Sequence, residues 1–66
     1  MTRVEALGKE ALELALYLLN GGYNNMQFYA ATDRIHTICA EIGGNPRELM
    51  SNAQRLIDKQ PELGMA

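Results

Sequence analysis

The sequence predicts an all-α domain of three helices, arranged as a helical hairpin followed by a third helix after a glycine corner. Glycine pairs at Gly21-Gly22 and Gly43-Gly44 divide the chain, and glycine just past a helix end adopts the left-handed conformation without steric cost. Each of the three segments opens with a capping sequence, and none shows the alternation typical of a strand. We therefore expect a single helical domain over residues 1–66, with helices at about 3–20, 25–42 and 46–60.

The start of each helix is marked by a residue that can bond the free N–H groups of the first turn. Thr2, Asn24 and Asn45 are each followed three residues later by Glu or Gln, which is the pattern of a capping box. Pro46 suits the first helical position, where its missing N–H costs nothing. Pro61 is expected to end the third helix.

The first helix is the most apolar of the three. Its apolar side chains cover roughly 200° of the helix circumference, which is wider than one packing partner requires. One side can receive the other two helices, and the other side then has no partner within the chain. We therefore predict self-association through Leu12, Leu16 and Leu19. A second copy would also support the small core that a chain of 66 residues can form.

Each of the other helices carries one apolar stripe at helical spacing. The second helix offers Phe28, Ala31, Ile35, Ile38, Cys39 and Ile42. The third helix offers Leu49, Met50, Ala53, Leu56 and Ile57. We expect these stripes and the first helix to form the core.

Composition argues against several classes of protein. One cysteine and one histidine can form neither an internal disulfide nor an ordinary four-ligand zinc site. No catalytic set is evident, and the chain is short for a cleft, so we expect no enzyme, no cofactor and no metal. Glu10 and Glu13 interrupt the apolar stretch, which argues against a signal peptide or a membrane span. An unpaired Cys39 suits a reducing, cytoplasmic location.

Aromatic and polar side chains around the second helix are the candidate binding residues. Tyr29, Asp33 and His36 follow at i, i+4 and i+7 and therefore share a face away from the apolar stripe. Tyr17 and Tyr23 add aromatic surface near the same end, and tyrosine is favoured at interfaces. The same face can equally contact the first helix or a second copy. A small-ligand site formed between subunits is a further alternative.

The corner between the second and third helices resembles a helix-turn-helix in the spacing of Cys39, Ile42, Gly43 and Leu49. Its second helix would present five polar side chains to base edges, namely Asn45, Arg47, Ser51, Asn52 and Arg55. Residues 43–60 carry three basic against two acidic side chains, so the phosphate contacts that dominate DNA affinity are scarce.

These features favour a small cytoplasmic interaction protein that acts as a homo-oligomer through contacts with another protein, as a regulator, inhibitor or accessory subunit. The net charge of −2 gives no basic excess for nucleic acid, and we expect no membrane partner. A helix-turn-helix DNA-binding regulator using residues 38–55 is the first alternative. A small-ligand sponge is the second.

Overall fold

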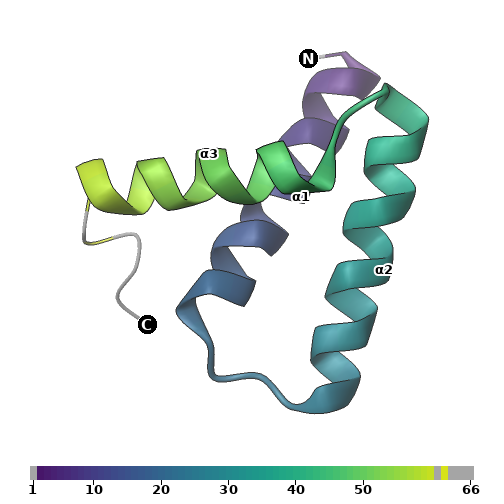
Figure 1. Ribbon diagram of the computed structural model, residues 1–66. Helices are drawn as coiled ribbons and strands as arrows, with labels where there is room; N and C mark the ends of the chain where they lie inside the picture. The colour runs from purple at the N-terminus through teal and green to yellow at the C-terminus, as the bar shows by residue number, and fades with distance from the viewer. Residues whose placement is uncertain (1, 61, 63–66) are drawn as a thin grey trace.

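The computed structural model describes residues 2–60 and residue 62, and these form three α-helices. They are α1 (Arg3–Asn20), α2 (Asn25–Ile42) and α3 (Pro46–Lys59). The predicted all-α, three-helix fold is confirmed, and the helix bounds agree except that α3 ends one residue early. The prediction for Pro61 lies outside the described residues. Figure 1 shows α1 and α2 as a hairpin, with α3 crossing α1 and pointing away from α2.

The caps form at the three predicted residues, and the predicted two-way capping box is complete at α2. At α2 the full capping box is present, with the N–H of Gln27 donating to Asn24 Oδ1 at 2.8 Å and the N–H of Asn24 donating to Gln27 Oε1 at 2.9 Å. At α3 the predicted bond to Glu48 is replaced, because Asn45 Oδ1 accepts from the N–H of Arg47 at 2.9 Å. An N-cap side chain can reach either the second or the third helical N–H, so the cap works in both forms.

The corner between α2 and α3 requires glycine. Gly43 has φ 74° and ψ 26°, which is the left-handed region that other residues avoid. Its N–H donates to the carbonyl of Cys39, as does the N–H of Gly44 at 2.8 Å. These bonds satisfy the end of α2 and let α3 begin at once in a new direction.

The core is built largely from small residues. Ala15 of α1 and Ala53 of α3 are completely buried in one cluster, and Ile38 of α2 is the largest side chain that is fully buried. The buried hydrophobic residues of the described chain are Leu7, Ala11, Ala15, Ala31, Ile35, Ile38, Cys39 and Ala53. Alanines make up half of this set, which allows α1 to approach two helices closely but buries little apolar surface.

Helix α1 uses its wide apolar arc within the chain. Leu12 and Leu16 are half-buried and pack against a cluster to which all three helices contribute. Helix α3 packs mainly on α1 and meets α2 chiefly near the corner. The expectation that one side of α1 lacks a partner is therefore wrong, because α3 turns away from α2 and packs on α1. Self-association through Leu12, Leu16 and Leu19 remains a prediction, but an unpartnered side of α1 no longer supports it.

Ion pairs connect α1 and α2 along their exposed edges. Arg3 Nη2 lies 2.7 Å from Glu41 Oε1, and Arg34 bonds both carboxylate oxygens of Glu10, at 2.5 and 3.1 Å. The hydrogen bond from Arg34, together with its charge, holds the pKa of Glu10 below its ordinary value. Exposed pairs of this kind contribute little stability.

Candidate functional site

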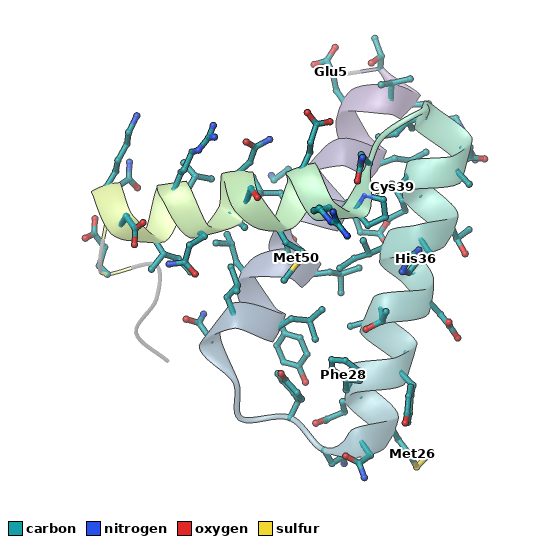
Figure 2. The ribbon with its side chains drawn as sticks, in the orientation of Figure 1. Glu5, Met26, Phe28, His36, Cys39 and Met50 are labelled. Carbon is teal, nitrogen blue, oxygen red and sulfur yellow. The ribbon has the colours of Figure 1, made fainter. Side chains whose placement is uncertain are left out.

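Four aromatic rings form a continuous row at the turn end of the hairpin. Tyr17 comes from α1, Tyr23 from the connection, and Phe28 and Tyr29 from α2. Successive ring centroids are 5.6, 5.8 and 5.7 Å apart, within the range of attractive aromatic pairs. The row links the two helices at the end that α3 leaves uncovered (Figures 1 and 2).

Exposed apolar surface is concentrated at this end. The exposed fraction is 81% for Met26, 66% for Tyr29, 40% for Phe28 and 36% for Leu19. Among the described residues, the other large hydrophobic residue that is exposed is Val4, near the start of α1. Apolar side chains exposed singly are common, but a concentration of them indicates an interaction surface.

The prediction that Phe28 belongs to the core stripe is wrong. Its spacing from Ile35 is the i, i+7 of a buried face, but Figure 1 shows α3 crossing the hairpin well away from this end. With no third helix above it, the Phe28 ring is left between Tyr23 and Tyr29. Helical periodicity predicts which face of a helix is buried. It does not predict how far along that helix the packing partner extends.

This end of the molecule also lacks charge. The nineteen residues from 14 to 32 include no Lys, Arg, Asp, Glu or His, so all fourteen charged residues lie elsewhere. We call residues 14–32 the uncharged end. The cores of protein interfaces are depleted in charged residues and enriched in Tyr, Phe and Met, and antibody binding loops favour Tyr, Gly and Asn. The same run also contains the buried Ala15 and Ala31, so the lack of charge alone does not tell the exposed Met26 and Phe28 from core residues.

The binding residues predicted on α2, Tyr29, Asp33 and His36, are all exposed, and they differ in their contacts with the aromatic row. Tyr29 joins Tyr17 and Tyr23 through the ring of Phe28. Asp33 and His36 are exposed and lie beyond the uncharged end, and neither forms a hydrogen bond or ion pair with the described part of the chain. Figure 2 shows His36 further along α2 than Phe28. The two polar residues therefore border the aromatic row and do not complete it.

The residues proposed to read DNA are all exposed, on α3 or at its start. They are Asn45, Arg47, Ser51, Asn52 and Arg55. The same helix exposes Glu48 and Asp58, and Asp58 accepts a hydrogen bond from Gln54 at 3.1 Å. The outer surface of α3 is polar and of mixed charge, so it concentrates no positive potential for a phosphate backbone.

No ligand pocket forms on the described part of the chain. Nor do any three His, Cys, Asp or Glu side chains among those residues come close enough to share a metal ion. The helices described are too short or too polar to cross a membrane. No family model, curated protein or solved structure matches the chain. What the arrangement offers chemically is an apolar contact surface with amide and phenol groups, suited to a macromolecular partner.

Proposed function

We propose that the protein is a small cytoplasmic interaction protein that binds another protein through its uncharged end, as a regulator, inhibitor or accessory subunit. The observation that supports this function best is the row of Tyr17, Tyr23, Phe28 and Tyr29 beside the exposed Met26. Self-association forms part of the proposal.

The aromatic row has the properties of a binding hot spot. With two thirds of Tyr29 exposed, on the order of 100–150 Å² of that residue remains to be buried, worth about 3 kcal/mol before the costs of association. The ring contacts along the row already restrict the side chains, so binding costs little further rotamer entropy. The amide of Asn25 and the phenols supply donors and acceptors beside the rings.

Site-specific photo-cross-linking in the cells that make the protein tests this function. The photoreactive residue p-benzoylphenylalanine would replace Tyr29, and in a matched control it would replace Arg55, which is exposed on α3. We expect a discrete cross-linked protein from position 29 and none from position 55. Cross-links to DNA from position 55, with none from position 29, would contradict the proposal and favour the helix-turn-helix alternative.

Affinity measurements with the captured partner then separate recognition from folding. We expect Tyr29→Ala to weaken binding at least tenfold, because a central aromatic contact is lost, while Tyr29→Phe retains most of the affinity. The melting temperature should change little, since Tyr29 is largely exposed. Val4→Ala is the matched control, because Val4 is an exposed apolar residue outside the uncharged end. Equal losses for Val4→Ala and Tyr29→Ala would refute the assignment of the surface.

A further inference from the structure

We infer that Met26 is a modification site, at which peroxide converts the thioether to a sulfoxide before it oxidises Cys39 or Met50. The thioether sulfur attacks one peroxide oxygen, so an S–O bond forms as the O–O bond breaks. The transferred oxygen gives its proton to the departing one, which leaves as water, and the methionine loses two electrons to hydrogen peroxide. The oxidant comes from solution and no other group of the chain takes part, so access to the sulfur decides the order of oxidation.

The three sulfur-bearing residues of the described chain differ in access. Met26 is 81% exposed, and Figure 2 shows it pointing away from the helices at the start of α2. Met50 is half-buried and packs against the cluster that contains Cys39, which is itself only 5% exposed. An accessible thiolate is oxidised readily, but a buried structural cysteine is inert. Burial therefore protects Cys39 and Met50 and leaves Met26 as the site that peroxide reaches first.

Oxidation at Met26 should leave the fold intact. Met26 lies in the first turn of α2, where the capping box is formed by Asn24 and Gln27. Its side chain belongs to neither of the buried clusters of the described chain. A sulfoxide is polar, and at this exposed position water can solvate it. The modification therefore changes the surface and not the core.

The sulfoxide would lie beside the proposed contact residue Tyr29. Met26 and Tyr29 are three positions apart on α2, and residues at this spacing are neighbours on one face of a helix. Both are exposed, so oxidation replaces an apolar group next to Tyr29 by a polar one. This consequence rests on the proposed function, because only a partner that covers Tyr29 would also bury the sulfoxide. Peroxide would then weaken binding, and enzymatic reduction of the sulfoxide would restore it.

Peroxide treatment of the purified full chain at neutral pH, followed by digestion and mass spectrometry, gives an oxidation rate for each residue. We expect Met26 to be oxidised about tenfold faster than Met50, and faster than Cys39. The control is the same reaction in concentrated guanidinium chloride, which removes burial. There the rates of Met26 and Met50 should agree within about twofold, and Cys39 should react readily. Folded-state rates of Met50 or Cys39 equal to that of Met26 would overturn the inference.

A binding titration with the captured partner tests the consequence at Tyr29. The chain oxidised at Met26 should bind about tenfold more weakly, with its melting temperature nearly unchanged, because the buried sulfoxide loses its hydrogen bonds to water. Met26→Leu treated in the same way keeps an apolar side chain and should retain its affinity. Unchanged affinity of the oxidised chain would refute the effect on binding. Selective oxidation in a chain that captures no partner would refute only the proposed function, whereas a captured partner beside a peroxide-resistant Met26 would refute only this inference.

Discussion

The two ends of the α1–α2 hairpin differ in how the space between the helices is filled. At the end crossed by α3, alanines such as Ala11 and Ala53 let the helices approach closely, and charged residues pair across the edge, as Arg3 does with Glu41. At the turn end no third helix is present, and aromatic rings cover the gap between helices while remaining partly exposed. The comparison teaches that a short chain can assign stability to one end and recognition to the other.

Removing bulk at the covered end should produce the largest effect. Ile38 is fully buried between α1 and α2, so Ile38→Ala should lower the free energy of unfolding by about 2–5 kcal/mol through lost contacts and a cavity. Chemical denaturation followed by circular dichroism measures this. Tyr29→Ala, at the other end, is the comparison and should cost about 0.5 kcal/mol or less. Similar costs at the two sites would break the proposed division between the ends.

Adding bulk where α3 crosses α1 should have the next largest effect. Ala53 is completely buried, so Ala53→Leu should destabilise the fold by about 1–3 kcal/mol by forcing the helices apart. Ser51→Leu introduces the same side chain at an exposed position of α3 and should cost little. Denaturation curves of the two variants give their free energies of unfolding. An Ala53→Leu variant as stable as Ser51→Leu would mean that α3 does not pack closely on α1.

The stability lost on replacing Phe28 shows whether its ring belongs to the aromatic row or to a continuous core. As a partly exposed ring between Tyr23 and Tyr29, it should cost about 1–2 kcal/mol when replaced by Ala. A fully buried Phe would cost about 3–5 kcal/mol. Unfolding at about 1 μM, where weak self-association is negligible, gives the value for a single chain. A loss in the higher range would return Phe28 to the core.

The salt dependence of self-association distinguishes contacts through the uncharged end from contacts through charged residues. Because residues 14–32 carry no charge, the dissociation constant of self-association through the uncharged end should change by less than about twofold between roughly 50 and 500 mM NaCl. Sedimentation at the two salt concentrations measures it. Duplex DNA binding through Arg47 and Arg55 would instead weaken steeply with salt. A strongly salt-dependent association would indicate that charged residues outside the uncharged end form the contact.

The ion pair between Glu10 and Arg34 should give the smallest effect. The pKa of Glu10 is lower in the folded chain, so its contribution is present above the unfolded-state pKa and is lost as pH falls through the folded-state pKa. We expect Glu10→Gln to lower the melting temperature slightly at pH 7 and by less at about pH 2.5, as the carboxyl becomes protonated. Glu13→Gln is the control, since Glu13 is exposed and outside both ion pairs. An equal decrease at both pH values would argue against the ion pair as the cause.

Local signals in the sequence were sufficient for the helices. Caps at Thr2, Asn24 and Asn45, with the left-handed glycine at Gly43, act within a few residues, so the sequence alone places the helix bounds. The direction of α3 depends on how the corner at Gly43 orients it against α1, which is a tertiary property. Helical periodicity therefore does not show that α3 covers the second side of the apolar arc of α1.

The candidate site was predicted only in part for the same reason. The three tyrosines were identified by residue type, and the structure brings them into one row through Phe28. Phe28 itself was assigned to the core because periodicity cannot show that α3 stops short of it. Asp33 and His36 were grouped with Tyr29 by helical spacing, although the row continues towards Tyr23 and not along α2.

A dilution series followed by amide NMR spectra of the wild-type chain tests the central claim most directly, namely that the uncharged end is the contact surface. Between about 500 and about 10 μM, we predict concentration-dependent shifts confined to residues 14–32 and their immediate neighbours. Resonances of α3 and of the first two turns of α1 should stay in place. Shifts centred on Leu12 or on Arg47 and Arg55, or no shifts at all over this range, would contradict the account.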